Sequence, residues 1–153
     1  MPARSPQKSE WYADGLRFEC TMCGACCTGP PGYVAFTEPE GRAMAAHLGV
    51  DEREFYRRFA HRMTHGKRGW SLNEVETEHG ADCVFLDRES KPGMALCRLH
   101  EVRPTQCRTW PWWPENLKSE RAWNDAAKRC EGMNRGPMVR VEEIRIQRDR
   151  TPA

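Results

Sequence analysis

The sequence predicts a small, loop-rich α+β domain with a few short helices and a β-hairpin. Two observations lead to this prediction. Leu, Ile, Val and Phe make up only 21 of the 153 residues, below the roughly 20% under which a chain struggles to bury enough apolar surface. The chain also has eight cysteines, and a structural zinc site contributes about 10–16 kcal/mol of apparent folding free energy. We therefore expect the domain to be stabilised by bound metal.

Three segments are expected along the chain. Residues 1–16 are polar and proline-containing, which predicts a flexible N-terminal arm. Residues 17–135 carry all eight cysteines and are expected to form the metal-binding domain. Residues 136–153 are rich in charge and are expected to form a C-terminal tail. Within that tail the pattern of residues 139–146 leaves strand and helix both open.

Helices are expected after the first cysteines and again near the C-terminus. A capping box formed by Thr37 and Glu40 predicts a helix that ends at Gly49. A second box begins at Asp51 and precedes apolar residues that recur every four positions, which is helical periodicity: Phe55, Phe59 and Met63. A further short helix is expected over residues 119–129.

A β-hairpin is expected between these helical regions. Residues 83–87 and 94–99 read as two short strands, and the polar stretch between them contains Pro92 and Gly93, which favour a turn. This hairpin would bring Cys83 close to Cys97.

The cysteines are the most informative residues of the chain. Four of them lie within eight residues, and the other four are isolated in the second half: Cys20, Cys23, Cys26 and Cys27, then Cys83, Cys97, Cys107 and Cys130. Thiolates two residues apart converge on one soft cation or on an iron–sulfur cluster. Gly24, inside the run, permits the positive φ that such a turn needs.

Metal ligation is expected over disulfide bonding. The N-terminal residues contain no apolar stretch that resembles a signal peptide, so the chain is expected to be cytoplasmic, where thiols stay reduced. No apolar run approaches the length of a membrane span.

The ligand spacing favours an iron–sulfur cluster and leaves zinc open. Three cysteines at two-residue spacing are similar to the first three ligands of a bacterial four-iron cluster. The later four cysteines form no CxxC pair, whereas zinc usually takes such pairs. Two sites of four ligands are the simplest division. In one arrangement Cys20, Cys23 and Cys26 share a site with a distant cysteine, while Cys27 points to the second site.

Other candidate residues have plainer explanations. Arg103 and Arg108 flank Cys107 and could donate hydrogen bonds to thiolate sulfur, or they could be solvated surface residues. His61 and His65 have helical spacing without the Glu of a metalloprotease motif, and His100 could replace a cysteine ligand. Acidic residues near turns are expected to be solvated: Asp82, Asp87 and Glu101.

The tryptophans carry no firm site. Several lie among basic residues and could stack on nucleic-acid bases, but rings that exclude water from a metal site explain them as well. Nucleic-acid binding is therefore not expected. No catalytic motif is identified, so the sequence leaves open whether the protein is an enzyme.

The ordered combination of these motifs resembles a known family. The motifs are Phe18-x-Cys20-x-x-Cys23-Gly24-x-Cys26-Cys27, Cys83-x-Phe85-Leu86, Cys97, Arg103-Pro104-x-x-Cys107-Arg108-x-x-Pro111 and Cys130. They resemble the CxxCxxCC cysteine-cluster family of zinc- or iron-chelating domains, over about residues 18–135. A flagellin lysine methylase has a similar cysteine module in a longer chain. The resemblance implies that all eight cysteines are metal-site candidates, although Glu131 stands where relatives are expected to have proline.

Taken together, the sequence favours a metal-binding cysteine-cluster protein. The leading hypothesis is an iron–sulfur protein whose cluster serves electron transfer, sensing or the support of a partner enzyme. The alternatives are a zinc-binding structural or interaction module and an accessory part of a methylase-like, protein-modifying enzyme. The expected partner is a metal ion or cluster; a protein partner is possible, and a membrane partner is not expected.

Overall fold

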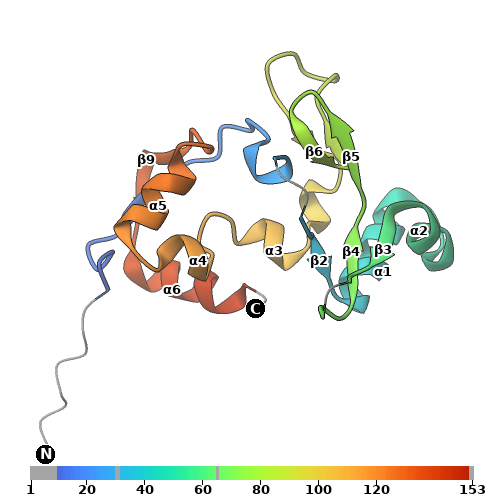
Figure 1. The fold of residues 1–153 in the computed structure, drawn as a ribbon, viewed down its shortest axis with the longest axis horizontal. Coiled ribbons are helices and arrows are strands. Elements are labelled where there is room, and N and C mark those ends of the chain that lie inside the picture. Colours follow the sequence, from blue (N-terminus) through green and yellow to red (C-terminus); the bar gives the residue numbers. More distant parts are fainter. Residues whose placement is uncertain (1–9, 30–31, 65, 152–153) are drawn as a thin grey trace, which may run out of the picture. The chain divides into compact units, whose positions relative to one another are not determined.

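The computed structural model describes residues 10–29, 32–64 and 66–151. They divide into two compact units. We call residues 10–21 and 111–151 the terminal unit, and the described residues from 22 to 110 the central unit. Both units combine short helices with small antiparallel sheets (Figure 1), which confirms the expected α+β class.

The central unit contains three antiparallel sheets. Its helices are η1 (Ala25–Cys27), α1 (Glu38–Leu48), α2 (Glu52–Phe59), η2 (His100–Val102) and α3 (Thr105–Arg108). Its strands are β2 (Ala35–Phe36), β3 (Ala60–Arg62), β4 (Trp70–Leu72), β5 (Glu74–Thr77), β6 (Gly80–Cys83), β7 (Leu86–Asp87) and β8 (Leu96–Cys97). The sheet orders are β2-β4-β3, β5-β6 and β7-β8.

The predicted helix starts are present in α1 and α2. Thr37 Oγ1 accepts a hydrogen bond from the Glu40 amide at 3.3 Å, and the Glu40 carboxylate accepts one from the Thr37 amide at 2.9 Å. This is the expected capping box, and the helix ends at Gly49 with φ 71°. Asp51 likewise accepts from the Glu54 amide at 2.8 Å.

The end of α2 differs from the periodic pattern. We expected that pattern to continue to Met63, but the helix ends at Phe59 because Ala60 takes an extended conformation. Residues Ala60–Arg62 form β3, which pairs with β4. Pairing with a strand about ten residues further along the chain therefore overrides the local helical signal.

The predicted hairpin is present but shorter than expected. Leu86 and Asp87 pair with Cys97 and Leu96, so the hairpin consists of β7 and β8 alone. Cys83 does not belong to it: this residue ends β6 and lies opposite Glu74 of β5. The two cysteines are thus carried by different small sheets.

Aromatic rings replace the missing aliphatic residues in the core of the central unit. Phe55 is fully buried, stacks on Phe85 with ring centroids 6.4 Å apart, and meets Phe36 edge to face at 5.9 Å. Such ring pairs contribute about 0.5–1.5 kcal/mol beyond their area burial. The remaining buried members of this core are Met44, Ala45, Ala60, Leu72 and Leu99.

The terminal unit has one two-stranded sheet and three helices among its described residues. Its elements are β1 (Leu16–Phe18), α4 (Pro114–Leu117), α5 (Glu120–Ala127), β9 (Met133–Val139) and α6 (Val141–Arg150). β1 pairs antiparallel with β9. The expected helix near residues 119–129 is present as α5, capped by Ser119. Trp112 and the buried Trp123 stack at 5.3 Å in this unit.

The segment expected as a charged tail contains the end of β9 and all of α6. The strand stops at Val139 and the helix starts at Val141, so residues 139–146, for which both states were open, adopt both. Ile144 of α6 is fully buried. Residues 1–9 of the expected arm lie outside the described residues, but Glu10 pairs with Arg145 of α6 at 2.9 Å.

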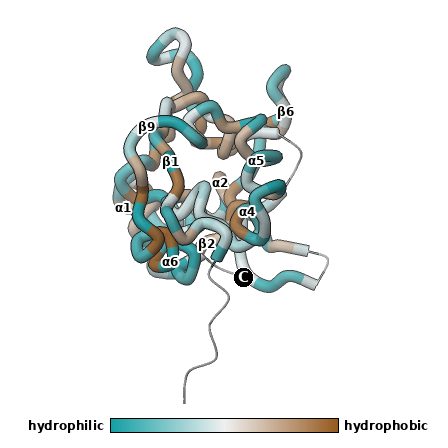
Figure 2. The backbone as a smooth tube through the Cα atoms, turned by 90° about the vertical axis from the view of Figure 1, so that its left-hand side faces the viewer, coloured by the Kyte–Doolittle hydropathy of each residue, from teal (hydrophilic) through white to brown (hydrophobic). Residues whose placement is uncertain are grey.

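In the described part of the chain, no helix combines the length and the apolar character needed to span a bilayer. Figure 2 agrees: the apolar stretches are short and are interrupted by hydrophilic ones.

Candidate metal centre

The eight cysteines divide unequally between the two units. Six lie in the central unit and two in the terminal unit: Cys23, Cys26, Cys27, Cys83, Cys97 and Cys107, then Cys20 and Cys130. All eight lie in described segments, and no disulfide joins any of them.

Two neighbouring cysteines form the beginning of the candidate site. The sulfurs of Cys26 and Cys27 are 3.8 Å apart. This contact is the main cause that raises the pKa of Cys26, and desolvation by the surrounding protein raises the pKa further. Part of the Cys26 residue nevertheless remains exposed to solvent. The two sulfurs therefore lie near one another, and the division of the ligands between two sites stays a prediction.

Three cysteines from other elements share the electrostatic environment of Cys26. Burial is the main cause that raises the pKa of Cys107, and the charges of Cys83, Cys26 and Cys97 raise it further. We call these residues the five-thiol group: Cys26, Cys27, Cys83, Cys97 and Cys107.

The same influence acts on Cys83 and Cys97. Burial raises the pKa of Cys83 to about 11, with further contributions from Cys97, Glu74 and Cys26. Burial also raises the pKa of Cys97, and Cys26 adds to the shift. Each thiolate in the five-thiol group thus makes the next one harder to form, unless a cation compensates the charge.

A glycine shapes the turn that presents Cys26 and Cys27. Gly24 has φ 80° and precedes the single 3₁₀ turn of η1. A Cβ placed on Gly24 would lie 2.6 Å from the Cβ of Ala95. The positive φ predicted from the sequence is confirmed, and the close approach of residue 95 adds a second reason for glycine.

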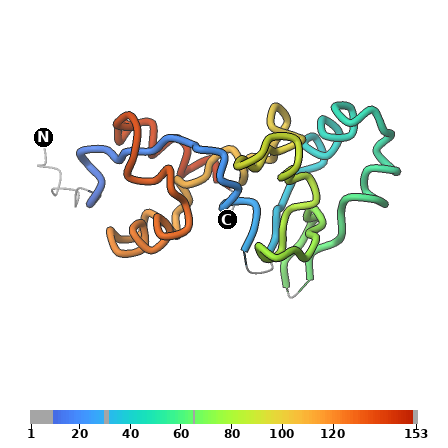
Figure 3. The backbone as a smooth tube through the Cα atoms, turned by 90° about the horizontal axis from the view of Figure 1, so that it is seen from above, coloured from blue at the N-terminus to red at the C-terminus, as the bar shows by residue number. Residues whose placement is uncertain are grey.

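Backbone hydrogen bonds join this turn to the two hairpins of the central unit. The Ala95 amide donates to the Met22 carbonyl at 2.8 Å, and the Ala81 amide donates to the Gly29 carbonyl at 2.8 Å. In Figure 3 the blue segment that ends at residue 29 runs beside the green strands accordingly. The turn is therefore held next to the hairpin strands that carry Cys83 and Cys97.

Cys107 is positioned by the short helix α3. Glu40 Oε2 accepts hydrogen bonds from the amide and hydroxyl of Thr105 at 2.6 and 2.8 Å. Gln106 donates to the Tyr33 carbonyl at 2.8 Å and accepts from the Ala35 amide at 3.1 Å. The two residues before Cys107 are thus fixed to α1 and to the region of β2.

The two arginines that flank Cys107 have different surroundings. The charge of Arg103 lowers the pKa of Cys26, Cys97 and Cys107, against the stronger causes that raise it. Arg108 instead lies 3.8 Å from the Glu40 carboxylate. Arg103 is therefore the flanking arginine whose charge acts on the five-thiol group.

Cys20 and Cys130 lie in adjoining segments of the terminal unit. The Glu19 amide donates to the Gly132 carbonyl at 3.0 Å, and the Thr21 hydroxyl donates to Glu131 at 2.6 Å. These bonds extend the β1–β9 pairing on both sides of Cys20. Cys130 is buried, with 6% of its surface exposed. Glu131, the next residue, is the acceptor of the hydrogen bond from Thr21.

His61 and His100 contact residues other than cysteine. His61 Nδ1 lies 2.8 Å from the Asn73 side-chain oxygen, and it belongs to β3 rather than to a helix. His65 lies outside the described residues. His100 opens η2 three residues after Cys97, where its carbonyl accepts from Arg103 at 3.0 Å.

Sequence reasoning missed a buried ion pair beside the cysteine turn. Asp82 was expected to be solvated, but it is only 4% exposed and is bound by Arg88. Nothing in the sequence distinguishes this carboxylate from its solvated neighbours, because its burial depends on the pairing of β5 with β6.

The donor chemistry of the five-thiol group fits a soft metal. All five donors are sulfur, which suits zinc and iron–sulfur clusters. Burial is the main cause that raises the pKa of Cys83, Cys97 and Cys107, and a bound metal would favour loss of these protons. Within the described residues, no three His, Cys, Asp or Glu side chains are grouped closely enough to hold a metal ion.

An open groove of about 800 Å³ lies on the central unit. It runs along β5 and β6, and its lining includes Arg58, His61, Glu74 and Val84. Glu74 is also the strand partner of Cys83.

Comparisons with known proteins agree with the cysteine pattern. The chain is 31% identical over 105 residues to an uncharacterised protein of Methanocaldococcus jannaschii, an alignment that covers 69% of this chain and 50% of that protein. The chain thus spans about half the length of this relative. No solved structure matches.

Residues 19–131 match the CxxCxxCC family, described as "Putative zinc- or iron-chelating domain". Because this match covers most of the chain and includes all eight cysteines, the chain belongs to the CxxCxxCC family of zinc- or iron-chelating cysteine-cluster domains.

Proposed function

We propose that the chain is an iron–sulfur protein and that the five-thiol group supplies ligands to its cluster. The observation that supports this proposal is the backbone anchoring of the Cys26–Cys27 turn to the hairpins that carry Cys83 and Cys97. The charges of Cys26, Cys83 and Cys97 also act on Cys107 of α3. When bound, such a cluster would supply electron transfer, sensing of oxidants or support of a partner enzyme.

The electrostatics of the group support the binding of a cationic centre. Thiols must lose their protons to bind metal, and the neighbouring thiols oppose that loss in the protein without metal. A positively charged centre reverses this opposition, and Arg103 compensates part of the remaining negative charge.

All eight cysteines remain proposed ligands. Cys20, Cys23 and Cys130 are proposed as ligands together with the five-thiol group. The surrounding protein would keep the group in place through the anchored turn at Gly24 and the anchored helix α3.

Zinc is the second candidate, and one distance is compatible with it. In a tetrahedral site with zinc–sulfur bonds of about 2.3 Å, neighbouring sulfurs lie about 3.8 Å apart. The sulfurs of Cys26 and Cys27 have this separation. A zinc centre would make the chain a structural or interaction module in place of a redox protein.

Anaerobic purification followed by metal analysis tests the proposal. An iron–sulfur protein contains iron and acid-labile sulfide in stoichiometric amounts and absorbs in the visible range, with a spectrum that changes on reduction. Stoichiometric zinc without labile sulfide would reject the cluster and support the second candidate.

Two variants test the ligand assignment. Cys107→Ser should lose bound metal, since it removes a buried donor that the charges of Cys83, Cys26 and Cys97 influence. His100→Ala is the matched control and should retain metal. Retention by both variants would contradict the assignment of Cys107, and loss by His100→Ala would assign a ligand role to the imidazole.

A further inference from the structure

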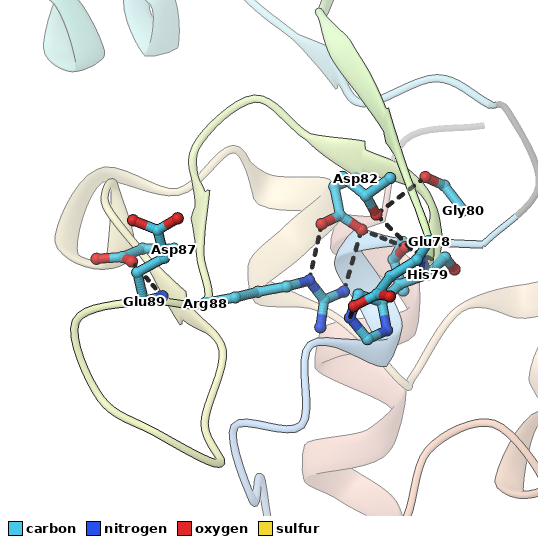
Figure 4. Close-up of polar contacts among 9 residues, drawn as sticks. Glu78, His79, Gly80, Asp82, Asp87, Arg88 and Glu89 are labelled. Carbon is cyan, nitrogen blue, oxygen red and sulfur yellow. Dashed lines mark hydrogen bonds and ion pairs between the residues drawn. The ribbon is translucent and has the colours of Figure 1, made fainter.

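A buried carboxylate lies next to the chain segment that carries Cys27. Asp82 of β6 is only 4% exposed. Its oxygens accept hydrogen bonds from Arg88 Nε at 2.8 Å and Arg88 Nη2 at 3.0 Å, as Figure 4 shows. A third hydrogen bond comes from the hydroxyl of Thr28. A buried carboxylate requires such partners, because an uncompensated charge at this position costs several kcal/mol.

The same carboxylate anchors both the arginine and the cysteine turn. Thr28 directly follows Cys27, so its bond to Asp82 fixes the backbone beside the Cys27 thiol. Arg88 reaches this carboxylate from the loop after β7. Asp82 thereby binds both the guanidinium of Arg88 and the hydroxyl of Thr28, the residue that follows Cys27.

Hydrogen bonds to one carboxylate bring the guanidinium and the residue after Cys27 together. The hydrogen bonds to Asp82 are the main cause that raises the pKa of Arg88, and the charge of Cys27 adds to the shift. Asp82 uses two of the five N–H donors of the arginine. The others remain available to a neighbouring acceptor, and a metal-bound thiolate is an acceptor of this kind.

We propose that Arg88 is a positioning residue of the metal centre: oriented by Asp82 and Thr28, its guanidinium compensates the charge of the metal-bound Cys27 thiolate and donates to its sulfur. This inference rests on the proposed function. It assigns Cys27 a counter-charge of its own, distinct from Arg103, which acts on Cys26, Cys97 and Cys107.

The test compares three single variants of the full-length protein. Arg88→Met removes the charge and keeps much of the volume, and Arg88→Lys keeps the charge but loses the fork that binds Asp82. Arg145→Met is the matched control, because Arg145 also binds a carboxylate with two nitrogens but is influenced by Glu10, Glu142 and Arg148 rather than by a cysteine.

Zn²⁺ affinity is measured by competition with a chromophoric chelator, and the midpoint potential is measured on reconstituted protein. Arg88→Met should weaken zinc binding about 10- to 100-fold, Arg88→Lys should recover part of that loss, and Arg145→Met should match the wild type. Loss of a nearby cation should also move the midpoint potential to more negative values, since it disfavours the added electron.

A double variant separates this role from a purely structural one. Arg88→Met leaves Asp82 buried without its partner, whereas Asp82→Asn combined with Arg88→Met removes both charges. The inference holds if both variants remain folded by circular dichroism and both bind zinc weakly. It is overturned if the double variant binds like the wild type, or if Arg88→Met does. Failure of the wild type itself to bind any metal would overturn the proposed function together with this inference.

Discussion

At the scale of single residues, the turn at Cys26 and Cys27 depends on Gly24. The sequence predicts a positive φ there, because a tight turn between cysteines needs one, and the structure confirms it. The approach of Ala95 to the same residue could not be predicted, since it follows from a hydrogen bond between segments more than seventy residues apart.

Gly24→Ala should destabilise the protein more than the equivalent change at a glycine with the same conformation and open space. The added Cβ would be 2.6 Å from Ala95 Cβ, and overpacking of this kind costs about 1–3 kcal/mol beyond the cost of the left-handed backbone. Gly49→Ala is the control, because Gly49 has φ 71° with nothing within 4 Å. Urea denaturation measures both variants; equal losses would contradict the predicted clash.

Charged residues near the cysteines illustrate the limit of prediction at this scale. Both Arg103 and Arg108 flank Cys107 in the sequence and are equivalent candidates there. The structure separates them, because the α1 capping residue Glu40 lies beside Arg108. The side chain that binds Asp82 comes from Arg88, which no cysteine motif includes.

At the scale of elements, α3 is held by side-chain hydrogen bonds and has only four residues. A helix this short is not stable by itself. Gln106 connects it to the Tyr33 carbonyl and the Ala35 amide, so this one amide side chain restrains the segment that carries Cys107.

Gln106→Ala should therefore destabilise the central unit and loosen metal binding. The change leaves two partly buried backbone groups without these partners, which costs about 1–3 kcal/mol. We expect a lower free energy of unfolding and faster transfer of metal to a chelator. Gln147→Ala, on the exposed face of α6 where Gln147 bonds Glu143, should change stability by less than about 0.5 kcal/mol. Similar behaviour of the two variants would refute the anchoring role.

Helix α6 is tied to the N-terminal segment by an acid-sensitive pair. Hydrogen bonds from Arg145 are the main cause that lowers the pKa of Glu10 below its usual 4.5. A carboxyl group whose pKa is lower in the folded state stabilises the fold above its unfolded pKa, and this contribution disappears as the pH falls through the folded pKa.

Glu10→Gln should accordingly reduce the stability at pH 6 and have no effect at pH 2. The reduction should stay below about 1 kcal/mol, because the pair is partly exposed and screened by solvent. Denaturation curves of the wild type and the variant at both pH values measure the difference. A difference that is the same at both pH values would exclude the ion pair as its cause.

The elements themselves were predictable to the extent that their signals are local. The caps at Thr37, Asp51 and Ser119 identify α1, α2 and α5 from neighbouring residues alone. The strands depend on distant partners: β1 pairs with β9, more than a hundred residues away. Periodicity after Phe59 predicted helix because it carries no information on the pairing of β3 with β4.

At the scale of the molecule, each unit has buried aromatic rings in its core. Phe36, Phe55 and Phe85 fill the central unit, and Trp112 with Trp123 fill the terminal unit. The low aliphatic content recognised in the sequence is thus offset in part by rings, which bury more area per residue. The expectation that bound metal is essential for folding remains a prediction.

Removal of metal under anaerobic conditions should lower the unfolding temperature. A ligand present at about a thousand times its dissociation constant stabilises a protein by about 4 kcal/mol, which corresponds to roughly 8–16 °C for a chain of this size. Differential scanning calorimetry with and without a chelator measures the shift, and added metal should restore it. Identical transitions in both samples would contradict metal-dependent stability.

The distribution of the five-thiol group along the chain has a consequence for biosynthesis. Cys26 and Cys27 leave the ribosome well before Cys107. At about 5–20 residues per second, the 80 residues from 28 to 107 take about 4–16 s to translate. During that interval the nascent chain displays adjacent thiols whose later partners have not yet been made. Loading of the centre is therefore expected to be a late, post-translational event, and the early cysteines need a reducing environment until it occurs.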